Sequence, residues 1–526
     1  MFRNHTQPNI MSPSSEDASD SLNSLLKTLE QLPSQLATSR RASFNILAPP
    51  ISPTIRQVAH LITMVQGVGS LYDSVGVQYL PLVFPEDCLS HRLLRGFGAT
   101  PVALPNRPLI SKASLFGSLT AKLILSCGRS SRLINTTHRG LLYGDLAYDT
   151  TLRLQGSRAI CPSVPFLNKH YLYRLWDTLY YLDLFDRLFE GYKPNLVVAY
   201  DRSYNIEGSL VRAALHHGIP CLLFWSQTDL ALLSSPVDDL TDPRTPSLLH
   251  FMKSALAEDL VAAHNYFRRR IAGDPSVDEQ AVRAFSPVMP PSSSHAPPMG
   301  QSPSQRPTVL IAAHCFIDFP HLTRNQIFLD YYEWLEQTLE FTVSRTDFDW
   351  VVREHPMSFQ FGETGLVKEL CARFQHVRYA SSEVSMRDLL QSADAVVTVR
   401  GTVGMEATLF GCQVICAGTS IYSALGLATV CSNKQDYFRE LSSITKGKQF
   451  CQERVDKAAL ALYFLFELNP VQSMFNNEMG CISTGPALNE LEREILRMQL
   501  FQKFAQNNRI HDDDIAVRVR NILKGP

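Results

Sequence analysis

Three short apolar runs in the second half of the chain constrain its fold most strongly. They lie at residues 350–352, 395–399 and 414–416. Each run is too short for a helix and lacks the alternation of a half-exposed strand, so each predicts a strand buried on both faces. A helical pattern at residues 405–410 separates the last two runs. This order predicts an α/β fold with a parallel sheet.

Polar residues and glycines follow these runs. Arg353, Glu354 and His355 come directly after the first run and are followed by Pro356. Ligands of open parallel sheets bind beyond the carboxyl ends of the strands, so we expect one crevice there. The helix start near Thr402 adds unpaired amides that favour an anion, which suits a nucleotide monophosphate or diphosphate. The predicted lining residues are Glu354, His355, Thr402, Glu406 and Gly418.

The same stretch resembles a known family. Residues 353–356 read REHP, and residues 402–418 read TVGMEATLFGCQVICAG. Together with residues 309–339, they resemble the donor-nucleotide half of bacterial capsule polysaccharide biosynthesis proteins, and the resemblance covers residues 195–230 and 307–430. It implies the two-lobed GT-B glycosyltransferase architecture, with two Rossmann-like lobes that face a central cleft. It also implies a nucleotide sugar in the second lobe, with CMP-activated acids such as Kdo as the first expected donors.

Such a transfer requires a stabilised leaving phosphate. His355, on a loop stiffened by Pro356, is the residue that we expect to donate to this phosphate. Thr402 and the amides of Val403 and Gly404 would hold the same phosphate. The alternatives are a histidine satisfied by the backbone and a threonine that only caps its helix.

Four further residues complete the predicted donor site. Glu406 would accept a hydrogen bond from a ribose hydroxyl, as acidic residues do in other nucleotide folds. Arg400 stands where relatives usually carry a small or amide residue, so it either adds charge against a phosphate or is a surface substitution. His314 and Asp318 follow the strand pattern at residues 309–312, and we expect them to line the cleft. Their spacing with a nearby histidine would also suit a metal, but no matched second cluster exists, so we expect none.

The acceptor hydroxyl also needs a base. An apolar run at residues 195–200, a helical pattern and a second apolar run predict a βαβ unit in the first half. Asp201 and Glu207 lie at its functional edge, and we expect one of them to be the base, unless they cap the helix instead. Asp145 and Asp149 are weaker candidates, because a capped surface turn explains each of them.

A chain of 526 residues is too long for one ordinary core, so we expect two lobes. Polar composition predicts a disordered tail at residues 1–42, ahead of an acceptor-side lobe at residues 43–272. A Pro- and Ser-rich stretch at residues 273–307 predicts a linker, and residues 308–450 form the nucleotide-sugar lobe. Helices are expected over residues 451–526, the last of them crossing back to brace the first lobe.

The charge balance excludes some partners. The 49 basic and 50 acidic residues give a net charge of -1, so no global field attracts nucleic acid. The 11 cysteines include no CxxC spacing, and no signal peptide or membrane-spanning run is evident, which predicts a cytoplasmic protein. The expected partners are a nucleotide sugar, used as substrate without a further cofactor, and a glycan or glycolipid acceptor. Peripheral contact with the inner membrane face or with export machinery is a further expectation.

Three other functions are compatible with this sequence. A polyol-phosphate transferase of the CDP-glycerol type also uses an HP loop, although its second turn is typically richer in tyrosine and serine. A nucleotide-sugar epimerase shares the double-Rossmann plan but needs no acceptor site. The third is a non-catalytic subunit of polysaccharide export or assembly, which would bind polysaccharide or export machinery.

Overall fold

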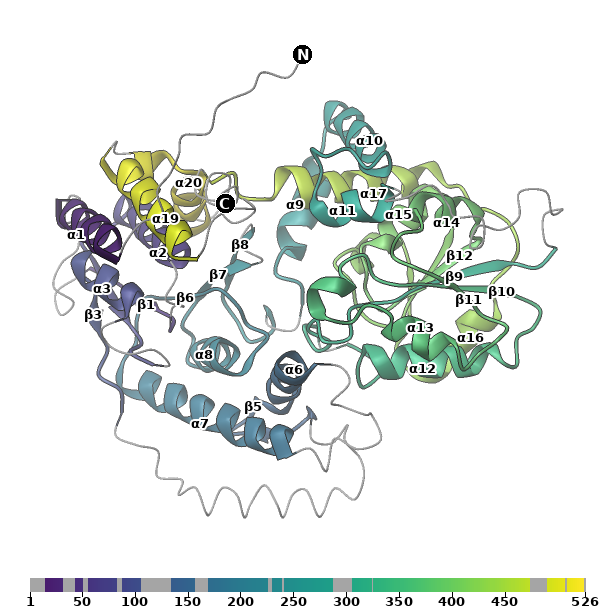
Figure 1. Ribbon diagram of the computed structural model, residues 1–526, viewed down its shortest axis with the longest axis horizontal. Helices are drawn as coiled ribbons and strands as arrows, with labels where there is room; N and C mark the ends of the chain where they lie inside the picture. The colour runs from purple at the N-terminus through teal and green to yellow at the C-terminus, as the bar shows by residue number, and fades with distance from the viewer. Residues whose placement is uncertain are drawn as a thin grey trace.

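The computed structural model forms two α/β units side by side, each built on a six-stranded sheet (Figure 1). This confirms the predicted α/β class with parallel sheets. The residues that the structure describes are 15–31, 43–50, 55–82, 88–105, 134–156, 169–225, 229–238, 241–286, 305–323, 325–473, 490–506 and 509–524. Among them, no helix is both long enough and apolar enough to cross a bilayer.

The first sheet has the strand order β3-β2-β1-β6-β7-β8. Its neighbours pair in parallel except β8, which is antiparallel to β7. Four consecutive residues of β6 are buried, as expected for a central strand covered on both faces. The strands are β1 (Phe44–Ala48), β2 (Val75–Tyr79), β3 (Thr100–Pro101), β6 (Leu196–Ala199), β7 (Cys221–Trp225) and β8 (Asp229–Leu233).

Helices cover this sheet, and a small hairpin accompanies them. The helices are α2 (Ile55–Gly69), α3 (Leu89–Gly96), α6 (Gly144–Gln155), α7 (Lys169–Gly191) and α8 (Asn205–His216). Strands β4 (Thr137–His138) and β5 (Leu141–Leu142) form the antiparallel hairpin. Helix α6 lies on the side of this unit that faces the second unit (Figure 1). It therefore brings its side chains to the boundary between the units.

The second sheet has the order β11-β10-β9-β12-β13-β14, and all its neighbours are parallel. After β9 the chain builds outward through β10 and β11, and it then returns to the other side of β9 with β12. The strand order therefore reverses at β9, which is where open α/β sheets bind ligands. The strands are β9 (Thr308–Ala312), β10 (Asp349–Arg353), β11 (Arg378–Ala380), β12 (Ala395–Thr398), β13 (Gln413–Cys416) and β14 (Thr429–Val430).

The connections of this sheet are mostly helical. They are α12 (Tyr331–Thr342), α13 (Leu366–Cys371), α14 (Met386–Ser392), α15 (Val403–Leu409) and α16 (Lys434–Ser442), with 3₁₀ turns at Ser358–Phe361 and Ser423–Leu425. Helix α17 (Gln452–Tyr463) continues as a π-helical turn, Phe464–Leu468.

The boundary between the units differs from the prediction. Helices α9 (Thr245–Ser254), α10 (Ala257–Ile271) and α11 (Glu279–Phe285) share a core with strand β12 and helix α15 of the second sheet. The predicted first lobe at residues 43–272 therefore ends too late, and the predicted linker at residues 273–307 includes a packed helix. The Pro- and Ser-rich composition hid this helix, because only seven of its residues are helical. Residues 287–304 of that linker lie outside the described residues.

The predicted tail also contains a packed helix, α1 (Ser15–Gln31). Its apolar residues Leu22, Leu25 and Leu29 recur at helical spacing and are buried in the core of the first unit. Ordering of this helix by packing explains why polar composition alone misassigned it. The rest of residues 1–42, apart from α1, lies outside the described residues.

The chain ends on the first unit. Helices α19 (Glu490–Gln506) and α20 (Asp514–Lys524), with a 3₁₀ turn at Arg509–Asp512 between them, bury apolar residues in the core that contains β1 and β2. Gln502 Nε2 donates to Ser24 Oγ over 2.7 Å, which joins α19 to α1. In Figure 1 both C-terminal helices lie beside α1 and α2.

Candidate active site

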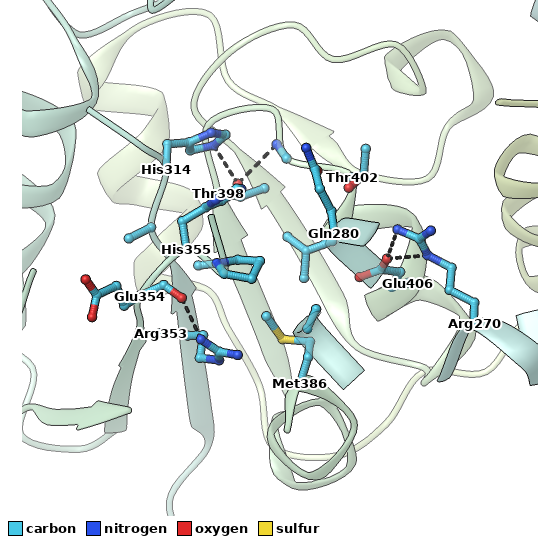
Figure 2. Close-up of a pocket in the computed structure, with 16 residues that line it drawn as sticks. Arg270, Gln280, His314, Arg353, Glu354, His355, Met386, Thr398, Thr402 and Glu406 are labelled. Carbon is cyan, nitrogen blue, oxygen red and sulfur yellow. Dashed lines mark hydrogen bonds and ion pairs between the residues drawn. The ribbon is translucent and has the colours of Figure 1, made fainter. Parts of the chain in front are cut away.

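A pocket opens at the carboxyl ends of β9, β10 and β12, where the strand order reverses (Figure 2). Its empty space is about 540 Å³, a volume that includes the open mouth. The residues that follow the three strands meet here, as the apolar runs predict. The lining residues are Arg270, Gln280, Ala284, Ala312, Ala313, His314, Arg353, Glu354, His355, Pro356, Met386, Thr398, Gly401, Thr402, Val403 and Glu406.

His355 lines the pocket from the loop after β10. Its Nδ1 accepts a hydrogen bond from the Met357 backbone N–H over 3.2 Å and lies 3.2 Å from Cys315 Sγ. Burial, with a smaller effect of Arg353, lowers the pKa of His355 to about 4. The ring is therefore neutral at pH 7, and an acceptor role for Nδ1 leaves the proton on Nε2. His355 can thus donate a hydrogen bond without carrying charge.

His314 lines the pocket from the end of β9. Its Nε2 lies 3.0 Å from Thr398 Oγ1 and accepts from the backbone N–H groups of Val399 and Arg400 over 3.3 and 3.4 Å. The ring stacks on Tyr331 with the centroids 4.3 Å apart. Burial lowers the pKa of His314 well below its usual value, with His355 and Arg400 nearby. This histidine is therefore also neutral and is fixed in one orientation.

The turn from Thr398 to Thr402 forms another wall. Thr398 Oγ1 accepts from the Gly401 N–H over 3.2 Å, and Tyr422 Oη donates to the Gly401 carbonyl over 2.8 Å. A Cβ on Gly404 would lie 2.1 Å from Tyr422 Oη, so only glycine allows this contact. Thr402 lines the pocket at the start of α15, but its side chain makes no cap hydrogen bond.

This geometry bears on two of the predicted phosphate contacts, Thr402 and the Gly404 amide. The alternative in which the Thr402 hydroxyl only caps its helix is wrong, because this hydroxyl makes no cap hydrogen bond with α15. The Gly404 N–H donates to the Gly401 carbonyl over 3.0 Å, so the turn itself uses this predicted donor. Val403 lines the pocket. Its part in phosphate binding stays a prediction.

Glu406 is buried and belongs to an ion cluster. Its Oε1 accepts from Arg270 Nε over 2.8 Å, and Arg270 Nη2 lies 2.8 Å from the same oxygen. Arg270 also donates to Asp278 and, over 3.2 Å, to Tyr266 Oη. The Glu406 carboxylate therefore points at Arg270 (Figure 2). The predicted ribose contact must be revised, because the carboxylate is engaged by a buried guanidinium.

The charged groups of Arg353 and Glu354 form hydrogen bonds with neighbouring parts of the protein. Arg353 donates to the carbonyls of Glu354 and Ser382, each over 2.7 Å. The Glu354 carboxylate accepts from the Gly365 N–H over 2.8 Å and from Tyr379 Oη. In Figure 2 this carboxylate points away from the other pocket side chains. Both residues line the pocket, but the hydrogen bonds of their charged groups mainly hold the loop that carries His355 in place.

Gly418 does not line this pocket, which corrects its predicted place in the crevice. A Cβ there would lie 3.2 Å from a methyl group of Val399 and 3.5 Å from the Asn325 carbonyl. Close packing between β13 and its neighbours therefore accounts for this glycine.

The predicted acceptor bases differ in their surroundings. Glu207 Oε2 accepts from the backbone N–H groups of Tyr200 and Asp201 over 2.6 and 3.0 Å, and burial raises the pKa of Glu207 to about 8. Asp201 Oδ1 accepts from the Ser203 N–H over 2.6 Å, and burial raises the pKa of Asp201. Glu207 thus holds the end of β6, whereas Asp201 is half-buried at the edge of the first sheet.

Asp318 and Arg400 lie at the boundary between the units. Arg400 Nη2 donates to the Phe319 carbonyl over 2.8 Å, and the Phe319 ring lies 5.1 Å from that of Tyr204 in the first unit. Burial raises the pKa of Asp318, Arg400 opposes the rise, and Asp201 adds to it. Neither residue lines the pocket. Arg400 therefore interacts with a backbone carbonyl and an acidic neighbour at the boundary.

The other two acidic candidates are paired. Asp145 forms two bonds with Arg212, of 2.6 and 2.7 Å. Asp149 Oδ1 lies 2.6 Å from His321 Nδ1, and its Oδ2 accepts from the His321 N–H over 3.0 Å. The pair of Asp149 and His321 joins α6 to the loop after β9. Among the described residues, no three His, Cys, Asp or Glu side chains gather as a candidate metal site.

Sequence reasoning missed three polar residues of the pocket. Arg270 and Gln280 come from the helices that were assigned to the first lobe and the linker, and Thr398 is the last residue of β12. A basic run at Arg268–Arg270 at the end of an amphipathic pattern was the only signal for the first. Thr398, a polar residue ending an apolar run, could have been recognised from the sequence.

The comparisons with known proteins agree with the sequence resemblance. Residues 302–447 match the model of the family described as "Capsule polysaccharide biosynthesis protein". No curated protein matches the chain significantly.

Solved structures give weaker likenesses. KpsC of Thermosulfurimonas dismutans is similar in its beta Kdo 2,4 transferase structure, with 16% identity, 58% of this chain and 87% of that chain covered, and a TM-score of 0.33. Its beta Kdo 2,7 transferase structure gives 12% identity, coverage of 60% and 88%, and a TM-score of 0.30. The structure of UDP-GlcNAc 2-epimerase from Methanocaldococcus jannaschii is 11% identical, with 80% of this chain and 98% of that chain covered and a TM-score of 0.26.

All three TM-scores are below 0.5, so no functional conclusion follows from them. The family match covers β9 to β14 and most of the pocket wall. Residues 302–447, which carry most of the pocket lining, therefore match the capsule polysaccharide biosynthesis proteins, the family that the sequence resembles.

Proposed function

We propose that the protein is a glycosyltransferase of capsular or surface polysaccharide assembly. It transfers a sugar from a nucleotide-sugar donor to a glycan or lipid-linked acceptor. The observation that carries this proposal is the pocket at the strand reversal of the second sheet, which lies largely within the segment that matches the capsule family. Glycosyl transfer fits such a pocket because it needs oriented donors for a leaving phosphate more than covalent chemistry.

In this proposal His355 donates its Nε2–H to the leaving phosphate. The Met357 N–H holds Nδ1 as an acceptor, which orients the ring and selects the required tautomer. A neutral donor can stabilise the charge that develops on the phosphate without attracting the ground state as strongly as a cation. Thr402 supplies a second donor from the opposite turn, and His314 lies between them at the end of β9.

The acceptor base is best supplied at the boundary between the units. Asp201 reaches this boundary from the first sheet and Asp318 from the second, and each carboxyl has a raised pKa. Two neighbouring carboxyls with raised pKa values suit proton uptake from a hydroxyl. We assign the base to Asp201, with Asp318 as the carboxyl that tunes it. Glu207 is excluded from this role by its two backbone hydrogen bonds.

A panel of nucleotide sugars tests this function. Purified protein is incubated with CMP-, CDP-, UDP- and GDP-activated donors, with and without a capsular glycolipid acceptor, and nucleotide release is followed. Acceptor-dependent release with a glycosylated product supports the proposal, and a CMP-activated acid such as Kdo is the first donor to try. Transfer of glycerol phosphate from a CDP-activated donor to the acceptor would favour a polyol-phosphate transferase. Sugar interconversion without an acceptor would favour an epimerase, and no turnover of any donor would leave a non-catalytic subunit.

A second experiment addresses localisation. A glycolipid acceptor would bring this protein to the inner membrane face as a peripheral protein. Co-sedimentation with vesicles that contain the acceptor lipid, compared with plain vesicles, would detect such recruitment. Equal partition to both would argue against recruitment through the acceptor.

A further inference from the structure

Helix α11 forms one wall of the pocket, although it precedes the second sheet in the chain. It contributes Gln280 and Ala284 to the lining, and Met386 of α14 lies on the same side of the pocket floor. The polar groups expected at the phosphate, on His314, His355 and Thr402, come from the ends of the strands instead. The pocket therefore has a polar sheet side and a mainly apolar side built by α11 and α14.

Helix α11 is anchored at both ends. Asp278 caps it by accepting from the Ala281 N–H over 3.0 Å and also receives a hydrogen bond from Arg270, which is paired with Glu406 of α15. At the other end Ser385 Oγ donates to the Phe285 carbonyl over 3.2 Å. The helix is thus held in a fixed position relative to α15 and α14, and it presents the same face to the pocket.

Gln280 is the polar side chain that α11 adds to this wall. It is exposed, and its side chain extends across the pocket in Figure 2. In the part of the chain that the structure describes, its amide forms no hydrogen bond with another residue, whereas the charged groups around it are paired with each other. A primary amide presents a donor and an acceptor side by side, which matches the edge of a heterocyclic base.

We propose that Gln280 recognises the base of the bound nucleotide, which lies between α11 and α14 with its phosphate at the strand ends. Ala284 and Met386 supply the apolar walls that a planar base requires, and Gln280 bonds its polar edge. This inference rests on the proposed function, because it assumes a nucleotide in the pocket. It adds that the segment between the two sheets determines which nucleotide binds.

Nucleotide binding by calorimetry tests this inference. CMP, UMP, CDP, UDP, AMP and GDP, with inorganic phosphate as the base-free probe, are titrated into the full-length protein and into Gln280→Ala and Gln280→Glu. Gln280→Ala should lower the affinity for the preferred nucleotide roughly three- to tenfold, because one neutral hydrogen bond is lost. The difference in affinity between nucleotides with different bases should become smaller. Phosphate affinity should stay unchanged. Gln280→Glu should change which base is preferred, since it replaces the amide donor with an acceptor.

The control is Glu279→Gln on the same helix. Glu279 is exposed, pairs with Arg283 over 2.9 Å and does not line the pocket, so its change should leave nucleotide affinity within about twofold of wild type. Unchanged nucleotide affinity and preference in both Gln280 variants, with normal binding in the wild type, would overturn this inference alone. If no nucleotide binds the wild-type protein, the inference and the proposed function both fail.

Discussion

The buried pair of Arg270 and Glu406 allows a quantitative test of the pocket. Both side chains are nearly inaccessible to solvent, at 2% and 4% exposure, and Asp278 provides the second partner of the guanidinium. Arg270→Met removes the cation and keeps an apolar chain of similar length against Phe466, whose ring lies 4.5 Å from the guanidinium carbon. The Glu406 carboxylate is then buried without its partner. We expect a loss of about 3 to 5 kcal/mol in the free energy of unfolding.

Glu406→Gln should cost less. Arg270 keeps Asp278 and Tyr266, and the glutamine oxygen can still accept from Nε, so we expect a loss of about 1 to 2 kcal/mol. The double variant should be less destabilised than the sum of the single changes by about 1 to 3 kcal/mol, because each single change removes the same interaction. Urea denaturation followed by circular dichroism measures all three values.

Two results would contradict these predictions. If both single variants unfold within about 0.5 kcal/mol of wild type, the ion pair does not form as described. If Glu406→Gln keeps full stability but binds nucleotide more than tenfold more weakly, the carboxylate contacts the ribose instead. Nucleotide titrations of the same protein samples separate the two outcomes.

Three further predictions concern the boundary and the catalytic groups. His355→Gln should lower turnover at least about 100-fold, as loss of an oriented donor does, with an unchanged circular dichroism spectrum; turnover within about threefold of wild type would remove this role. Asp201→Asn should abolish turnover, whereas Glu207→Gln should retain it within about threefold, because an amide oxygen can still accept both backbone hydrogen bonds. If steady-state assays show the opposite, Glu207 and not Asp201 is the base. Burial lowers the pKa of His321, but Asp149 outweighs this effect and raises it, so the contribution of His321 to stability should be complete below about pH 6.5 and fade as the pH rises through the raised pKa. Melting temperatures from pH 5 to 9 should show this loss in the wild type and a different pH dependence in His321→Gln, where burial alone raises the pKa of Asp149.

The strands of the second sheet and its ligand-binding edge could be predicted because their signals are local. Apolar runs at residues 350–352 and 395–399 became β10 and β12, and the residues after them meet at one edge as parallel strands require. His355 and Thr402 therefore reach the pocket as the sequence indicates. Periodicity carries this information because each buried strand is a contiguous stretch of chain.

The contributions of distant segments could not be predicted in the same way. Arg270 reaches Glu406 across 136 residues, and nothing in either local pattern identifies this pairing. Glu207 illustrates a second limit, since a carboxylate at a strand end can serve as a base or accept backbone hydrogen bonds, and both uses give the same sequence. Helix α1 illustrates a third, because its apolar stripe gains stability only from packing against α19 and the first sheet.

The position of a bound nucleotide is the most direct test of the proposed donor site. A crystal structure of the protein with CMP or UDP, whichever binds more tightly, would locate the phosphate. We expect a phosphate oxygen about 3 Å from His355 Nε2, beyond the carboxyl ends of β9, β10 and β12, with the base toward α11. A nucleotide bound at the first sheet, or a phosphate out of reach of both His355 and Thr402, would contradict it.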